Sequence, residues 1–265
     1  MGQNPDDCGD ESMITYVYGK NVGMMMLKES ERIIKVFLTQ KLYDQKWQSL
    51  LEENDLSYEI RDRKSLDLLS KGGNHQGLVI AMIAYETYDI EDLVEEVPPG
   101  ELGLLVMLDG IEDPHNLGAI LRNCDGAGAH GIIIPKHHSV SLNATVAKVS
   151  SGAIATVKVA EVSNLVSTIK FLKKQGYWIA GLQAGEKTIY DYDFLSPLVI
   201  VIGHEGKGIS RLVKENCDYM IGIPLAGTIK SLNASAVSAI SMYQIQHQRS
   251  LSLQVGKKND NLRKR

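Results

Sequence analysis

The sequence predicts an α/β protein in which a small N-terminal unit precedes a larger unit built on a parallel sheet. Three observations support this prediction. Short apolar segments alternate with segments of helical period along most of the chain. In the second half, segments such as 104–108 and 198–202 are apolar at every position, which is typical of strands covered on both faces. Between the halves, acidic residues and a Pro-Pro-Gly at 98–100 are typical of a linker.

We place the N-terminal unit at residues 13–90, after a leader at 1–12 that has almost no apolar content and is expected to be disordered. The helix expected at 44–54 is amphipathic, because its charged positions cover one side while Trp47, Leu50 and Leu51 are expected to face inward. The expected strands are 16–18, 35–39, 58–60 and 78–84, and the expected helices are 20–31, 44–54 and 62–69, with a turn-rich loop at 72–77. We place a linker at 91–101, with the boundary near residue 95.

The second unit, 102–250, alternates apolar strands with helices, so its strands are expected to run parallel. Expected strands are 104–108, 131–134, 154–159, 178–182, 198–202 and 220–223; expected helices are 117–127, a short one ending at 149, 164–174, 209–215 and 232–248. The basic tail, 251–265, is either a solvated charge run or a phosphate contact.

Composition excludes several classes of protein. Hydrophobic residues make up 44% and charged residues 23% of the 265 residues, which is ordinary for a globular chain, and the net charge of -4 does not favour a nucleic-acid partner. Cys8, Cys124 and Cys217 are odd in number and lack metal-ligand spacing, so we expect reduced thiols and no metal. No apolar run reaches about 18 residues, and the polar start does not resemble a secretory leader, so we expect a cytoplasmic protein without a membrane span.

The glycines at 126, 128 and 131 fit the Gly-x-Gly-x-x-Gly pattern of dinucleotide-binding proteins. That pattern must follow a strand and open a helix. Here the glycines close the helix 117–127 and lead into a strand, so they are better explained as a helix C-cap.

The first candidate motif, 109–123, follows the strand 104–108 and opens a helix. Asn116 is expected to be the N-cap of that helix, because its side chain can accept a hydrogen bond from a free N–H group of the first turn. Arg122 lies off the apolar stripe of the helix, so it is either an ordinary surface arginine or a residue that faces a ligand.

The second candidate motif, 203–208, contains three glycines within six residues directly after a strand. Glycines let the backbone turn tightly and approach a ligand. Glu205 lies in the middle, where its carboxylate can accept N–H groups or orient a substrate. The alternative is a plain strand-to-helix turn, which does not ordinarily need three glycines.

The third candidate motif, 221–236, leaves a strand, turns at Pro224 and Gly227 and opens a helix. Ser231 and Asn233 are good helix-starting residues, and the small residues at 234–239 allow another backbone to come close. The alternative is a helix cap followed by a tightly packed core helix. All three motifs follow predicted parallel strands, so we expect them to gather at one edge of the sheet, where open α/β folds bind ligands.

Taken together, Asn116-x5-Arg122, Gly203-x-Glu205-Gly206-x-Gly208 and Ile223-Pro224-x-x-Gly227-x3-Ser231-Leu232-Asn233-x-Ser235 resemble the three motifs of the SpoU/TrmH family of RNA ribose 2′-O-methyltransferases, over about residues 100–250. The N-terminal unit, with Tyr18-Gly19 and His75-Gln76-Gly77, is similar to the RNA-binding domain of the branch that methylates a guanosine of 23S rRNA.

The resemblance implies a fold of the SPOUT type with a deep trefoil knot, a homodimer formed through the catalytic domain, RNA as partner and neither metal nor membrane. It implies S-adenosylmethionine as cofactor, held by Gly203, Gly208, Ile223, Pro224, Gly227 and Leu232. It implies catalytic roles for Asn116, Arg122, Glu205, Ser231 and Asn233. Arg122 resembles the proposed base of the family, but arginine stays protonated up to pH ~12, so phosphate binding and charge stabilisation are the expected roles.

The chain departs from the family motifs at His204, Lys230 and Ala234, and none of these departures removes a functional group. Two alternatives remain within this resemblance. One is a tRNA ribose 2′-O-methyltransferase, and the other is a non-catalytic RNA-binding assembly factor of the same fold.

Overall fold

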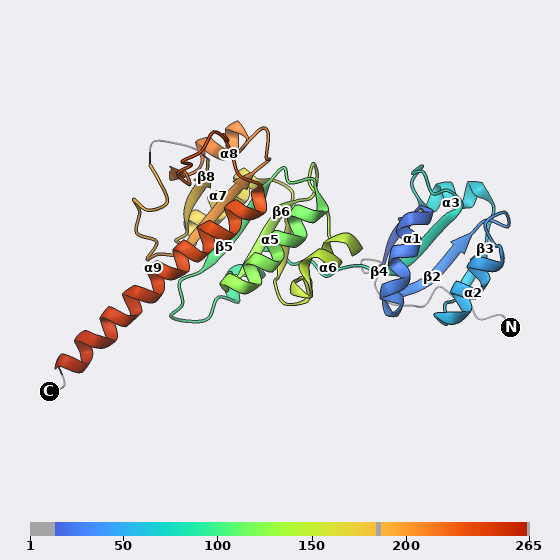
Figure 1. Cartoon of the computed structure of the whole chain (residues 1–265), viewed down its shortest axis with the longest axis horizontal. Helices are drawn as coiled ribbons and strands as arrows, with labels where there is room; N and C mark the ends of the chain where they lie inside the picture. The colour runs from blue at the N-terminus through green and yellow to red at the C-terminus, as the bar shows by residue number, and fades with distance from the viewer. Residues whose placement is uncertain (1–13, 184–186, 264–265) are drawn as a thin grey trace. The chain divides into compact units, whose positions relative to one another are not determined.

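A computed structural model describes residues 14–183 and 187–263 of the chain, and the predicted disordered leader at 1–12 lies outside these residues (Figure 1). The chain divides into two compact units, Met1–Glu86 and Thr87–Arg265. Each unit has its own sheet, so each is described separately.

Within residues 14–83, the first unit contains a four-stranded sheet with the order β1-β4-β2-β3. Strands β1 (Ile14–Tyr18) and β2 (Ile33–Leu38) pair antiparallel with β4 (Leu78–Ile83), while β3 (Tyr58–Ile60) pairs parallel with β2. The helices are α1 (Lys20–Met26), α2 (Gln45–Glu53) and α3 (Arg63–Leu69). The single helix expected at 20–31 is wrong, because the chain continues after α1 as the 3-10 helix η2 (Leu27–Arg32).

The His75-Gln76-Gly77 segment fixes the turn before β4. His75 is buried; its Nε2 atom lies 3.1 Å from Oδ1 of Asp67, and its Nδ1 atom accepts the N–H of Gly77 at 3.0 Å. Gln76 accepts the backbone N–H of Lys20 at the start of α1. This part of the motif therefore joins elements within the first unit.

The segment expected to be a linker carries the helix α4 (Ile90–Glu95). Its acidic residues suggested a solvated linker, but Asp89 and Asp92 form a capping box at the helix start, and Leu93 is buried in the second unit. The N–H of Tyr88 donates to the carbonyl of Val159 in the second unit. The boundary expected near residue 95 therefore lies too late in the chain.

In the described part of the second unit, a six-stranded sheet has the order β10-β8-β9-β5-β6-β7, and every adjacent pair is parallel. The strands are β5 (Leu104–Asp109), β6 (Gly131–Pro135), β7 (Val159–Val162), β8 (Trp178–Leu182), β9 (Leu198–Gly203) and β10 (Tyr219–Ile221). The prediction of a parallel sheet is confirmed.

Helices cover both faces of this sheet (Figure 1). On one face, α5 (Pro114–Ala127), α6 (Ala144–Ser150) and α9 (Ala234–Arg263) contribute apolar side chains that pack on alternate residues of β5 and β9. On the other face lie α4, α7 (Leu165–Lys174) and α8 (Arg211–Glu215). This explains why the strands are apolar at every position.

Two of the expected elements have clearly different bounds in the structure. The strand expected at 154–159 is wrong: Ser151 and Gly152 both have positive φ, the 3-10 helix η3 (Ala153–Ala155) follows, and the strand is β7. Helix α9 begins at Ala234 and extends to Arg263, through the segment expected to be a basic tail; the side chains from residue 253 onward lie outside the description. Gly128 caps α5 with a left-handed conformation, as its position after the helix predicts.

Helix α9 is tied to the sheet by Arg249. This guanidinium is buried and donates to the backbone carbonyls of Leu102 (2.6 Å), Phe194 (3.1 Å), Ser196 (2.9 Å) and Gly103 (3.3 Å). The four acceptors come from two chain segments near the starts of β5 and β9. One side chain of α9 therefore satisfies carbonyl groups that lie far apart in the sequence.

No helix in the described part of the chain is both long enough and apolar enough to cross a membrane.

Candidate active site

The ends of β5 and β9 lie side by side at the carboxyl edge of the sheet, since Asp109 pairs with Gly203 in the parallel register. The Oδ2 atom of Asp109 accepts the backbone N–H of Ser210 at 2.7 Å. This bond ties the first loop to the segment that follows the second. The first two motifs therefore start from adjacent backbone positions.

The 203–208 loop folds back on itself. His204 and Gly208 exchange two backbone hydrogen bonds, with N···O distances of 3.1 Å and 2.7 Å. A Cβ atom on Gly203 would lie 2.3 Å from the carbonyl carbon of Gly208, and Gly208 itself has a φ of +70°. Gly206 has ordinary space around it, with its nearest neighbour at 3.7 Å. Two of the three glycines are therefore required by the backbone.

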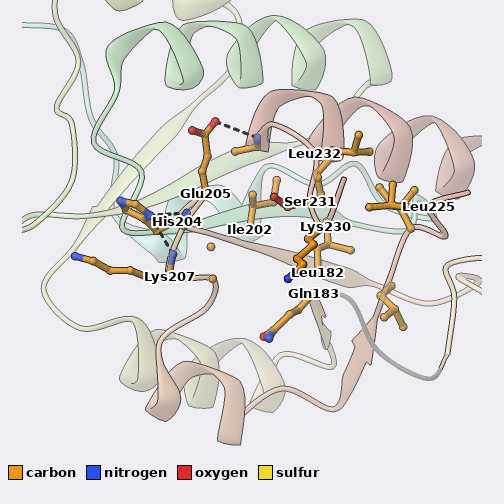
Figure 2. Close-up of a pocket in the computed structure, with 17 residues that line it drawn as sticks. Leu182, Gln183, Ile202, His204, Glu205, Lys207, Leu225, Lys230, Ser231 and Leu232 are labelled. Atoms are coloured by element: carbon orange, nitrogen blue, oxygen red, sulfur yellow. Dashed lines mark hydrogen bonds between the residues drawn. The ribbon is translucent and has the colours of Figure 1, made fainter. Parts of the chain in front are cut away.

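His204, one of the departures from the family pattern, organises this loop. Its Nδ1 atom accepts the backbone N–H groups of Gly206 (3.0 Å) and Lys207 (3.3 Å), as Figure 2 shows. These two contacts assign the acceptor role to Nδ1. An imidazole here does what an asparagine side chain does in an Asx turn.

The three motifs meet at a single atom, Oε1 of Glu205. It accepts the Nδ2–H groups of Asn116 (3.1 Å) and Asn233 (2.5 Å) and the backbone N–H of Ala234 (3.4 Å; Figure 2). Asn233 also donates from Nδ2 to Oδ1 of Asn116 at 2.9 Å. The prediction that the motifs gather at one edge is confirmed by these contacts.

Asn116 occupies a different position from the one expected. The N-cap of α5 is Asp113, whose Oδ1 atom accepts the N–H of His115 at 2.9 Å, and Pro114 is the first helical residue. Asn116 is therefore buried inside the first turn, and its side-chain amide is available to Glu205 and Asn233.

Asn233 starts α9. Its Oδ1 atom accepts the backbone N–H of Ser235 at 2.9 Å, which is the capping contact that its residue type predicts. The small residues that follow pack toward α5, where Nδ2 of Asn123 donates to the carbonyl of Ser235 and to Oγ of Ser238. The small residues at the start of α9 therefore allow a close approach of α5, which belongs to the same chain.

A cavity of about 370 Å³ lies beside the Glu205 cluster. Its lining comes from the ends of β8, β9 and β10, from the loops after β9 and β10 and from the start of α9 (Figure 2). The lining residues are Leu182, Gln183, Ile202, Gly203, His204, Glu205, Gly206, Lys207, Gly208, Ile221, Ile223, Leu225, Lys230, Ser231, Leu232, Ala234 and Val237.

Six of the predicted site residues lie in this lining: Gly203, Glu205, Gly208, Ile223, Ser231 and Leu232. The described lining does not include Pro224 or Gly227, which belong to the same loop, nor Asn116 and Asn233, which bind Glu205 from outside the cavity. Sequence reasoning missed Leu182 and Gln183. Their only signal was position, because they follow a predicted strand at the same edge of the sheet.

Arg122 lies apart from this cluster. It is exposed on α5, and its Nη1 atom donates to Oγ of Ser151 at 3.4 Å. It belongs neither to the described cavity lining nor to the hydrogen bonds of Glu205. The structure therefore brings four of the five predicted catalytic residues to the cavity or its edge, while the fifth, Arg122, lies outside the described lining on the helix that carries Asn116.

The cavity has the chemistry that S-adenosylmethionine requires. Apolar side chains such as Leu182, Ile202 and Ile221 offer a wall for a flat base, while the 203–208 and 223–232 loops offer backbone polar groups. In the described residues, no group of His, Cys, Asp and Glu side chains is arranged to hold a metal ion.

Comparison with known proteins agrees with this description. Residues 103–243 match the model of the SpoU rRNA Methylase family, and residues 16–88 match that of the RNA 2′-O ribose methyltransferase substrate-binding domain.

Two curated relatives are each 40% identical to this chain. The Putative TrmH family tRNA/rRNA methyltransferase YacO of Bacillus subtilis aligns over 239 residues, 88% of this chain and 96% of its own. The 23S rRNA (guanosine-2′-O-)-methyltransferase RlmB of Shewanella oneidensis also aligns over 239 residues, 88% of this chain and 97% of its own.

Among solved structures, the SpoU methyltransferase AviRb from Streptomyces viridochromogenes, in complex with the cofactor AdoMet, has a TM-score of 0.59 at 22% identity. The match covers 91% of this chain and 94% of that one. At this identity the likeness shows a shared fold.

Proposed function

This chain is an RNA 2′-O-ribose methyltransferase of the SpoU rRNA methylase family, and from that premise we propose that it methylates the ribose of a guanosine in 23S rRNA with S-adenosylmethionine. The observation that carries the proposal is the contact of three motifs through Oε1 of Glu205, beside a cavity of cofactor size. A factor that only binds RNA needs neither feature.

The reaction poses two physical problems. A ribose 2′-hydroxyl is a weak nucleophile because it stays protonated at neutral pH, so its oxygen must be held in line with the methyl group and must lose its proton as the O–C bond forms. Orientation contributes several kcal/mol, and proton removal about 10²–10⁴-fold in rate. S-adenosylmethionine supplies the methyl on a positively charged sulfur, and the S–C bond breaks as the O–C bond forms.

The backbone groups at Gly203, Gly208, Ile223 and Leu232 bind the cofactor, and Pro224 and Gly227 shape the loop that carries two of them. Asn116, Glu205 and Asn233 hold the three loops in fixed register through their mutual hydrogen bonds. Ser231, which lines the cavity, contributes a hydroxyl that orients the ribose. These residues supply the orientation that the reaction requires.

Arg122 binds a phosphate beside the target nucleotide, and its charge stabilises the oxygen as it loses its proton. A role as general base is disfavoured because a guanidinium stays protonated up to pH ~12 and so cannot accept a proton at neutral pH.

The first unit binds the RNA substrate, because its sequence matches the substrate-binding family and it folds around its own sheet. Its cations are balanced by acids, as in the Lys35–Glu59 and Arg61–Glu59 ion pairs. Selection of RNA therefore depends on shape and exposed bases more than on bulk charge.

We further propose that the catalytic unit forms a homodimer, contains the trefoil knot of its family and acts in rRNA processing in the cytoplasm. Tyr243 and Ile240 support the dimer, because α9 exposes both apolar side chains although its small residues are already used against α5. Analytical ultracentrifugation of the full chain tests the proposed homodimer, and a monomer at all concentrations would contradict it.

The test of the function is incubation of the protein with labelled S-adenosylmethionine and total RNA, followed by mapping of the modified ribose. We expect label in 23S rRNA at a guanosine. Label in tRNA would favour the alternative substrate, and absence of both label and cofactor binding would favour a non-catalytic assembly factor.

A further inference from the structure

Ser151, directly after α6, has a backbone conformation that serine rarely adopts. Its φ of +54° and ψ of 40° lie in the left-handed region, where a helix end normally has glycine because a Cβ atom is unfavourable there. Gly152 follows with a φ of +97°, so the turn contains two consecutive left-handed residues. Glycine would adopt this backbone conformation at position 151 with less strain. The serine therefore needs an explanation in the contacts of its side chain.

That side chain lies next to Arg122. The guanidinium donates from Nη1 to Oγ of Ser151 at 3.4 Å. Within the described residues, the Arg122 side chain makes this one hydrogen bond. Because both residues are exposed, the contact adds little to folding. It does restrict the orientation of a long and otherwise mobile side chain.

The packing of α6 on α5 is built to hold this position, and the two helices lie side by side in Figure 1. A Cβ atom on Gly118 would lie 2.7 Å from Cβ of Val149 and 2.9 Å from the carbonyl oxygen of Val146, so glycine is needed for the close approach of α6. Gly118 lies one helical turn before Arg122, on the same face of α5.

Further contacts fix the turn on either side of Ser151. The Oγ atom of Ser150, which is buried, donates to the carbonyl of Ala147 at 2.8 Å and accepts the N–H of Ile154 at 3.3 Å. The Oγ1 atom of Thr156 donates to Oδ1 of Asp125 at 2.7 Å, one turn after Arg122. The Ser151 hydroxyl is therefore presented from a rigid support.

We propose that Ser151 is a positioning residue for methyl transfer, which holds the Arg122 guanidinium toward the substrate. This inference rests on the role proposed above for Arg122. Arginine has five N–H donors, so one bond to Ser151 leaves four for a phosphate of the RNA. A pre-oriented guanidinium loses less freedom when the substrate binds and stabilises the developing charge more effectively.

The test separates the oxygen of Ser151 from its effect on the backbone. Ser151→Gly relieves the left-handed conformation, whereas Ser151→Ala keeps the Cβ atom, so only Ser151→Gly should raise the unfolding temperature. Both remove the oxygen, so both should lower kcat roughly tenfold, as expected for loss of a hydrogen bond to a charged group, with the KM for S-adenosylmethionine unchanged. Ser151→Asn should recover most of kcat, because asparagine tolerates this conformation and supplies an oxygen.

His138→Gly is the matched control. His138 is exposed, has a φ of +57° and lies in the second unit outside the described cavity lining, so the substitution should raise the unfolding temperature without changing kcat. If kcat follows stability across the Ser151 variants, or if Ser151→Gly keeps full activity while Arg122→Ala is inactive, the positioning role is wrong and the proposed function stands. Full activity of Arg122→Ala would overturn the positioning role together with the role of Arg122.

Discussion

Replacing Gly203 by alanine should destabilise the catalytic unit far more than the same change at Gly206, three residues further along the same loop. The new Cβ atom would lie 2.3 Å from the carbonyl carbon of Gly208, 2.4 Å from the nitrogen of Ile209 and 2.5 Å from the oxygen of Gly208. All three are backbone atoms, so rotation of a side chain cannot relieve the overlap.

The cost follows from what must move. The loop is closed by two backbone hydrogen bonds between His204 and Gly208, and separating them costs about 1 kcal/mol each. Residual overpacking adds about 1–3 kcal/mol, which gives a total of about 3–5 kcal/mol. For a domain of this size, about 2–4 °C of unfolding temperature is lost per kcal/mol, so we expect a decrease of roughly 10 °C.

Calorimetry of both variants tests this reasoning. Gly206→Ala meets its nearest neighbour at 3.7 Å, an ordinary contact, so its unfolding temperature should stay close to that of the unsubstituted protein. Because the 203–208 loop lines the cavity, Gly203→Ala should also lower affinity for S-adenosylmethionine at least roughly tenfold, a difference of about 1.4 kcal/mol. If the two variants unfold at the same temperature and bind the cofactor equally well, the steric argument is refuted.

Three further predictions concern Arg122, the two units and the thiols. Arg122→Ala should abolish methyl transfer while calorimetric binding of S-adenosylmethionine persists, because Arg122 is outside the described cavity lining; a fully active variant would remove Arg122 from the mechanism. A chain that begins at residue 87 should lose RNA affinity in a filter-binding assay but keep the cofactor site, since the sheet of the second unit is complete without residues 1–86; loss of both activities would contradict the division into units. Burial raises the pKa of the Cys217 thiol to about 11 and raises the pKa of Cys124 as well, so both thiols stay protonated at neutral pH. Mass spectrometry after iodoacetamide treatment of the folded protein should therefore find neither cysteine alkylated. Rapid labelling of Cys124 would show that α5 opens.

The gathering of the site could be predicted because parallel strands bring their carboxyl ends to one edge, and each motif follows such a strand. The contacts that join the motifs could not be predicted from the sequence. Oε1 of Glu205 binds Asn116 across 89 residues of sequence, and no local pattern specifies such a partner. Asn116 also looked like a helix cap, a role that Asp113 fills three residues earlier.

The errors in the predicted helices and strands have physical causes as well. The acidic residues of α4 suggested a solvated segment, although Leu93 is buried in the second unit and Ile90 and Val94 pack against the same core. The apolar run that starts at Ile154 suggested a strand, but the left-handed residues Ser151 and Gly152 lead into a 3-10 turn before the strand can begin. Local composition could not reveal either tertiary constraint.

The four carbonyl contacts of Arg249 bear on the order in which a ribosome can complete this protein. The carbonyl of Ser196 is synthesised 53 residues before Arg249, and that of Leu102 is synthesised 147 residues before it. Until Arg249 leaves the exit tunnel, both segments lack the donor that satisfies them in the finished molecule. The N-terminal unit can mature before these later segments are synthesised, whereas the cavity, whose walls include Val237, is completed only after that residue has emerged.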